Sequence, residues 1–124
     1  MLDTNALSAF ADGDLALRRV IEQEMEISLP VVVLGEYLYG IRHSRHHSRY
    51  REWLKRQLGV FSILPVDAGT AEHYAEIRAE LRSAGRPIPS NDLWIAALAR
   101  QYRHSVVSQD RHFDAIRGLP LITW

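Results

Sequence analysis

Cysteine is absent from this 124-residue sequence. The chain therefore has no disulfide framework, no thiolate zinc site and no cysteine nucleophile, which fits a reducing compartment. Its apolar runs are too short to cross a bilayer and no basic leader precedes one, so we expect a cytoplasmic protein without a membrane anchor. Repeats and low-complexity segments are also missing, and 47% of the residues are hydrophobic. We expect one packed domain over residues 1–124.

Lysine is nearly absent too, because Lys55 is the only one among 15 cations, which balance 15 acids. A protein that binds nucleic acid through its overall charge is normally basic, so any phosphate-binding surface here must be local. The place to look is the segment 42–56, where cations and three histidines stand against Glu52 alone. Its arginines, Arg42, Arg45 and Arg49 among them, suit contacts with phosphates or an acidic partner, but a merely solvated face remains an alternative. The histidines fit a solvated helix better than a zinc site.

Short apolar runs alternate with helical patterns along the chain. The strand-like runs are residues 1–2, 27–29, 60–66, 105–108 and 121–124, and the helical patterns are residues 14–24, 31–41, 46–58, 68–83, 90–102 and 111–117. Asp3 to Asn5 is expected to form a turn, and Ser90 to cap the helix after it. Tyr102 belongs to the buried stripe predicted for that helix. This alternation predicts an α/β domain of three layers, α/β/α, around a central, mainly parallel sheet.

Acidic residues follow the predicted strands of that sheet. Asp3 comes directly after the first strand, and Asp110 comes two residues after Val107, with Asp114 one helical turn further on. Asp92 lies in the first turn of the helix that begins near Ser90. Sites in open parallel sheets form beyond the carboxyl ends of the strands, so we expect these acids to meet at one edge.

Glu36 is the only charged residue between Leu29 and Ile41, in a helix that is apolar nearly all round. Such a helix is expected to be largely buried, where an unpaired carboxylate is costly. A divalent cation at the acid cluster is a fitting partner, and oxygen ligands favour Mg²⁺ or Mn²⁺ over zinc. A metal held in this way activates water for the hydrolysis of a phosphodiester bond.

Each acid alone also has a structural explanation. Asp3 suits a turn, Asp92 complements a helix dipole, and Asp110 suits a loop or a cap. Their arrival at one edge of the sheet favours a functional site. His112 and Phe113 are expected to pack the short helix rather than to act in catalysis.

Four segments in order, 2–5, 30–40, 89–97 and 107–113, resemble the PIN-domain ribonucleases, and most closely the VapC-type toxins of bacterial toxin–antitoxin pairs. The resemblance implies a PIN-like fold and a metal-dependent endoribonuclease that cleaves RNA and thereby inhibits translation. It implies Mg²⁺, with Mn²⁺ as a substitute, a homodimer and a VapB-like antitoxin. It also assigns the metal-binding, catalytic acids, namely Asp3, Glu36, Asp92 and Asp110.

The resemblance further implies supporting hydrogen bonds from Asn5 and Ser108, a secondary place for Asp114, and contacts of the basic segment with RNA or antitoxin. Only Met1 and Leu2 precede Asp3, fewer residues than in typical members. Either the natural chain begins earlier than this sequence, or the central strand is short and Asp3 is held less firmly. A housekeeping PIN nuclease and a catalytically degraded PIN-fold binding module remain alternatives. A receiver-like domain is disfavoured because it requires a lysine at the end of a late strand, and this sequence has none there. A haloacid-dehalogenase-like phosphatase is disfavoured because it requires a second Asp at the position of Asn5.

Overall fold

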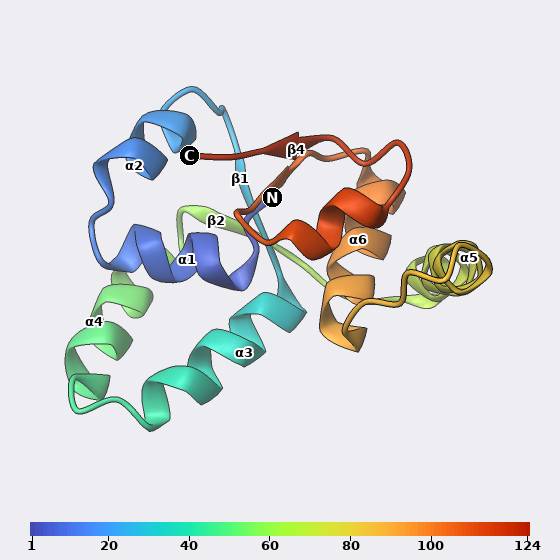
Figure 1. Cartoon of the computed structure of the whole chain (residues 1–124). Helices are drawn as coiled ribbons and strands as arrows, with labels where there is room; N and C mark the ends of the chain where they lie inside the picture. The colour runs from blue at the N-terminus through green and yellow to red at the C-terminus, as the bar shows by residue number, and fades with distance from the viewer.

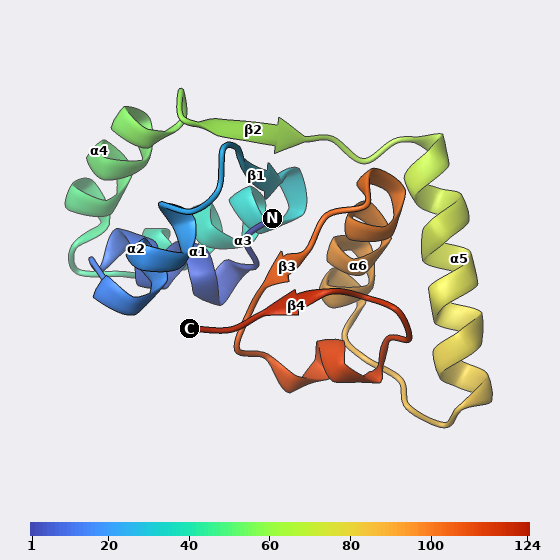
Figure 2. The ribbon, with the colours of Figure 1, turned by 90° about the horizontal axis from the view of Figure 1, so that it is seen from above.

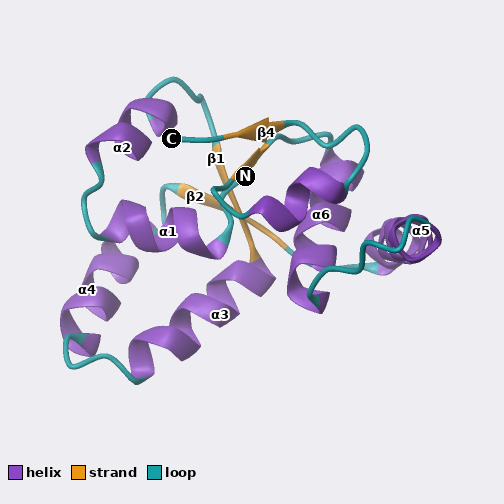
Figure 3. Cartoon of the chain, viewed as in Figure 1, coloured by secondary structure: helices purple, strands orange, loops and turns teal.

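Helices and short strands alternate in the computed structural model, which describes residues 1–124 (Figures 1 and 3). The strands are β1 (Ile27–Pro30), β2 (Phe61–Leu64), β3 (Val106–Val107) and β4 (Leu121–Ile122). The helices are α1 (Thr4–Ala11), α2 (Leu15–Ile21), α3 (Val31–Arg42), α4 (His47–Gln57), α5 (Ala68–Ser83), α6 (Ser90–Tyr102) and the 3₁₀ helix η1 (Arg111–Ala115). None of these helices has both the length and the apolar character needed to span a membrane.

Every strand pair is parallel. β1 pairs with β2 from Ile27 opposite Phe61 onward, and β3 pairs with β4. Leu2 lies between the two pairs, because it bridges Val107 and its amide donates to the carbonyl of Ser28 at 3.0 Å. Figure 2 shows α5 and α6 on one side of the strands and α1, α2 and α4 on the other. The predicted three-layer α/β/α fold is therefore confirmed, and the strand expected at residues 1–2 is present as the single bridge of Leu2.

Helix α6 forms the middle of the core. Leu93 and the run Ile95–Ala99 are buried, so this helix is apolar on nearly all sides where it meets α5, α3 and η1. Two details of the prediction are wrong. Ser90 is the first helical residue rather than the cap, since the N-cap is Pro89, and Tyr102 is 38% exposed at the frayed end of the stripe.

The expected turn at Asp3 to Asn5 is wrong, because the chain enters α1 there. Asp3 is the N-cap of this helix, and its Oδ1 accepts a hydrogen bond from the amide of Ala6 at 2.7 Å. An aspartate that suits a turn suits an N-cap equally well, and the sequence pattern did not separate the two. Ala6 and Leu7 then bury the inner face of α1 against α3.

Helix α3 is only half covered, contrary to the prediction of a largely buried helix. Val33, Tyr37 and Ile41 form its buried face, whereas Val31 and Tyr39 are 42% and 68% exposed. An apolar composition all round therefore does not mean burial all round in this chain. Glu36 lies at the edge between the two faces and is half-buried.

Candidate active site

Asp3 is held in a buried hydrogen-bonded position at the carboxyl end of the short central strand. It is 4% exposed, and its amide donates to the carbonyl of Val107 at 3.2 Å. The hydroxyl of Ser108, itself buried, donates to Asp3 Oδ2 and accepts from the amide of Asp110 at 2.8 Å. The expectation of a loosely held Asp3 is therefore wrong, because Ser108, directly after β3, and Ala6 of α1 each donate to one oxygen of its carboxylate.

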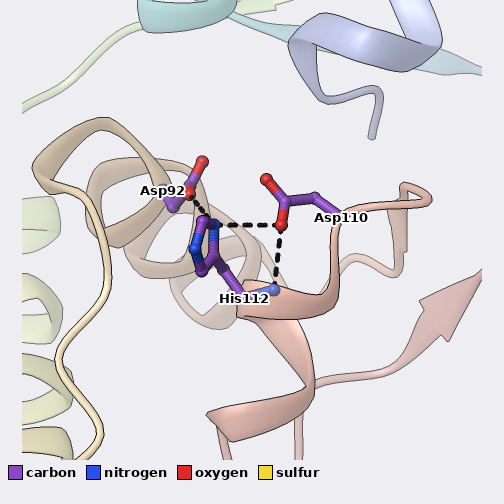
Figure 4. A group of neighbouring side chains, drawn as sticks. All are labelled: Asp92, Asp110 and His112. Carbon is purple, nitrogen blue, oxygen red and sulfur yellow. Dashed lines mark hydrogen bonds and ion pairs between the residues drawn. The ribbon is translucent and has the colours of Figure 1, made fainter.

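Asp92 and Asp110 both approach the same ring nitrogen of His112 (Figure 4). Nδ1 of His112 lies 3.2 Å from Asp92 Oδ2 and 3.0 Å from Asp110 Oδ1. Asp110 is also the N-cap of η1, since its Oδ1 accepts from the amide of His112 at 2.9 Å. In Figure 4 the second oxygen of each carboxylate points away from the ring.

Glu36 completes a group of four carboxylates from four segments of the chain. Its negative charge acts on both Asp3 and Asp92, and Asp110 acts on the same two residues. Its Oε1 is shielded from solvent and has no hydrogen-bond partner in the protein. The structure therefore brings Asp3, Asp92 and Asp110 to one edge of the sheet, as the strand-end argument predicts. Glu36, predicted from its apolar helix, lies near enough for its charge to act on two of them.

The negative charges of the four carboxylates repel one another. Burial raises the pKa of Asp92 to about 6, and the charges of Asp110, Glu36 and Asp3 add to this effect while His112 opposes it. Burial also raises the pKa of Asp3, although the hydrogen bonds from Ser108 and Ala6 partly offset the rise. A site in which ionisation is disfavoured in this way is stabilised by a cation.

A divalent metal ion fits these residues. Ligand atoms of Asp92, Asp110 and His112 lie within 4.8 Å of one another. The unpartnered oxygen of Glu36 and the mutual repulsion of the carboxylates are both relieved by a positive charge placed among them. Clustered carboxylate oxygens are the ligands that hard divalent cations take in proteins.

The remaining predicted site residues lie outside the cluster. Asn5 is exposed in the first turn of α1, and its side chain makes no hydrogen bond. Asp114 is half-exposed and its carboxylate pairs with Arg111 at 3.8 Å, so the geometry does not favour it as a ligand. The three arginines of the basic segment are exposed around the turn between α3 and α4 and form no ion pair, namely Arg42, Arg45 and Arg49.

His112 is the residue of the site that the sequence interpretation missed. Phe113 packs the short helix, being 0% exposed, but the side chain of His112 is 50% exposed and turns to the acids instead. The signal was its position two residues after Asp110, which places its ring beside the cap that Asp110 forms. No feature of the sequence showed that Asp92 would approach the same ring.

Comparison with known proteins defines the class to which this fold and site belong. The family model of the PIN domain matches residues 1–119, so the chain belongs to the PIN-domain family. Within that family its curated relatives are VapC ribonucleases. Ribonuclease VapC5 of Mycobacterium tuberculosis is 44% identical over 120 residues, which cover 95% of this chain and 87% of the relative.

Two further comparisons cover the whole chain. The tRNA(fMet)-specific endonuclease VapC of Shigella flexneri is 30% identical over 127 residues, or 100% of this chain and 96% of the relative. The structure of VapBC2 from Rickettsia felis bound to a DNA fragment from their promoter contains a chain that superposes with a TM-score of 0.91. That chain is 27% identical, and the match covers 100% of this chain and 97% of the other. The predicted fold and family are thus confirmed.

Proposed function

We propose that this protein is a metal-dependent endoribonuclease that hydrolyses phosphodiester bonds in RNA, and that it is the toxin of a toxin–antitoxin pair. Residues 1–124 act as its single nuclease domain. The observation that carries the proposal is the gathering of Asp3, Glu36, Asp92 and Asp110 at one edge of the sheet, in a chain whose relatives are VapC ribonucleases. Of the predicted supporting residues, Ser108 holds Asp3, whereas Asn5 makes no such bond.

The cofactor we propose is Mg²⁺, with Mn²⁺ as a substitute, held by carboxylates of the four acids. Bound there, it supplies a nucleophilic water and stabilises the charge that develops on the phosphate. The chain's own groups prepare the site. Ser108 fixes the orientation of Asp3, and the imidazole of His112 keeps Asp92 and Asp110 at a fixed separation. Glu36 or Asp92 is placed to accept a proton from the attacking water.

The proposed substrate and partners follow from the relatives. We propose that the protein acts in the cytoplasm and that its substrate is RNA. The proposed partner that silences the enzyme is a VapB-like antitoxin. One similar solved structure is VapBC2 of Rickettsia felis, and another, VapBC-5 of Mycobacterium tuberculosis, is described as a member of the VapBC family of toxin–antitoxin systems. We also propose a homodimer. The exposed arginines Arg42, Arg45 and Arg49 are free to contact RNA phosphates or acidic antitoxin residues.

Binding of Mn²⁺ tests the site directly. The metal-free protein is expected to gain about 2–3 kcal/mol of stability when Mn²⁺ reaches 100 times its dissociation constant, which raises the melting temperature by roughly 5–10 °C. Asp110→Asn removes a ligand charge and is expected to lose most of this gain. Asp114→Asn is the matched control, because its carboxylate lies outside the cluster, and it is expected to behave as wild type.

A folded protein whose melting temperature does not respond to Mn²⁺ or Mg²⁺ would contradict this function. It would leave the chain as a PIN-fold binding module without catalysis.

A further inference from the structure

A cavity of about 220 Å³ opens between α1, α3 and α4, beside the acid cluster. Glu36 forms the wall that the cavity shares with the cluster, and Thr4 follows Asp3 directly in the chain. Thr4 is therefore the chain neighbour of one of the four acids and Glu36 is itself another, while both also line this separate space. The groups that matter for its chemistry are Thr4, Ser8, Asp12, Glu36, Tyr37 and Tyr50.

Unpartnered polar atoms concentrate in this cavity. Only four buried side-chain atoms in the protein lack a hydrogen-bond partner, and three of them belong to its lining residues, namely Thr4 Oγ1, Glu36 Oε1 and Tyr37 OH. Tyr37 is 4% exposed, and its ring packs against Trp53 with the centroids 6.2 Å apart. Leaving such atoms unpaired costs about 1–3 kcal/mol each, so their presence at one place points to a ligand that pairs them.

The lining also restricts the charge of that ligand. It contains two carboxylates and several hydroxyls but no arginine or lysine, so a phosphate group would be repelled. The hydroxyl of Tyr50 donates to Asp12 Oδ1 at 2.8 Å, which leaves Oδ2 of Asp12 as a further acceptor. Tyr37, Tyr50 and Ile41 add apolar surface. An uncharged flat ring with hydrogen-bond donors on its edge satisfies these requirements.

We propose that this cavity binds one unpaired nucleobase of the RNA beside the bond that is cut, and that the base is guanine. The inference rests on the proposed function, which places RNA at the neighbouring acids. Guanine carries an N–H and an amino group side by side, which match the carboxylate of Asp12, and its O6 accepts from a hydroxyl such as Tyr37 OH. Single-stranded RNA is recognised in this manner, by bases turned out of the stack into pockets that read their edges.

Cleavage of a randomised single-stranded RNA pool by wild type and Tyr37→Phe tests the proposal. Wild type is expected to select guanine at one fixed position next to the cut. Tyr37→Phe keeps the ring against Trp53 and loses only the hydroxyl, so the guanine preference is expected to fall about tenfold with the fold intact. Tyr39→Phe is the matched control on the same helix, because Tyr39 is 68% exposed and does not line the cavity. Its cut-site pattern is expected to equal that of wild type.

Thr4→Val repeats the test with a second unpartnered hydroxyl and is also expected to weaken the preference. Cutting by wild type without any base preference near the cut would overturn the proposal. So would an unchanged preference in both cavity variants, since a merely structural role changes the rate without changing the choice of base.

Binding of single nucleosides separates this inference from the proposed function. Guanosine is expected to shift the NMR signals of Thr4 and Tyr37 in the full chain at lower concentration than adenosine, cytidine or uridine. This result in a protein that cuts no RNA would refute the nuclease and keep the base pocket. Shifts caused by agmatine but by no nucleoside would overturn the pocket, because the cavity would then take a cationic side chain of a protein partner.

Discussion

Asp92→Asn is expected to abolish RNA cleavage and at the same time to stabilise the metal-free protein. Removing groups that merely support metal ligands typically lowers activity 10–100-fold, so loss of the ligand charge itself is expected to lower it by at least about 100-fold. The substitution keeps the shape of the side chain, and the amide oxygen can take the place of Asp92 Oδ2 beside His112 Nδ1. The fold is therefore retained.

The gain in stability depends on pH. The pKa of Asp92 rises from 3.8 to about 6 in the folded chain, first through burial and then through the charge of Asp110. A raised carboxyl pKa means that the folded protein binds the proton more tightly than the unfolded chain does. The loss of folding stability caused by ionising Asp92 is absent below pH 3.8, grows up to about pH 6 and is complete above that pH. Asp92→Asn lacks this penalty, so at neutral pH it is expected to be about 1–3 kcal/mol more stable than metal-free wild type.

Thermal unfolding of both proteins in EDTA, from pH 3.5 to pH 8, measures this difference. The two stability curves are expected to separate as the pH rises. Asp114→Asn serves as the control for charge removal near η1, and its curve is expected to follow that of wild type, because Asp114 is half-exposed and pairs only with Arg111. Parallel curves for Asp92→Asn and wild type, or full cleavage by the variant, would show that Asp92 does not belong to a strained acid cluster.

Leu2→Ala is expected to lower the free energy of unfolding by about 2–5 kcal/mol. Leu2 is 1% exposed and is the residue through which the β1–β2 pair and the β3–β4 pair join. Truncating its side chain leaves a cavity in the core at the junction of the two strand pairs. The neighbouring Asp3 depends on the same backbone contacts, so cleavage is also expected to fall at temperatures where the variant remains folded.

Leu15→Ala is the matched control for this prediction, because it removes the same atoms from a side chain that is 69% exposed. Chemical denaturation of the three proteins is expected to leave Leu15→Ala within about 0.5 kcal/mol of wild type. A Leu2→Ala protein as stable as the control would refute the role of Leu2 as the link between the strand pairs.

The fold could be predicted where local signals agree with the final packing. The helix expected at residues 68–83 has those bounds in the structure, because Asp67 and Thr70 form a capping box at its start and Gly85, with a φ of +67°, follows its end. The meeting of Asp3, Asp92 and Asp110 could also be predicted, since parallel strands place their carboxyl ends at one edge. These inferences need only the order of the elements.

The features that could not be predicted depend on contacts between distant segments. Helix α1 was not predicted, because its first residues also suit a turn. The approach of His112 to Asp92 requires η1 to lie against the start of α6, which the sequence of neither segment reveals. The unpartnered hydroxyl of Tyr37 is visible only once α1, α3 and α4 enclose it. Composition likewise did not show which face of α3 is covered.

Cleavage of end-labelled single-stranded RNA by the purified protein, first in EDTA and then after addition of Mg²⁺ or Mn²⁺, tests the central claim most directly. We predict intact RNA in EDTA, discrete fragments once the metal is added, and none with Asp92→Asn under the same conditions. Fragments that form equally well in EDTA would contradict the claim. So would intact RNA in the presence of a folded protein saturated with metal.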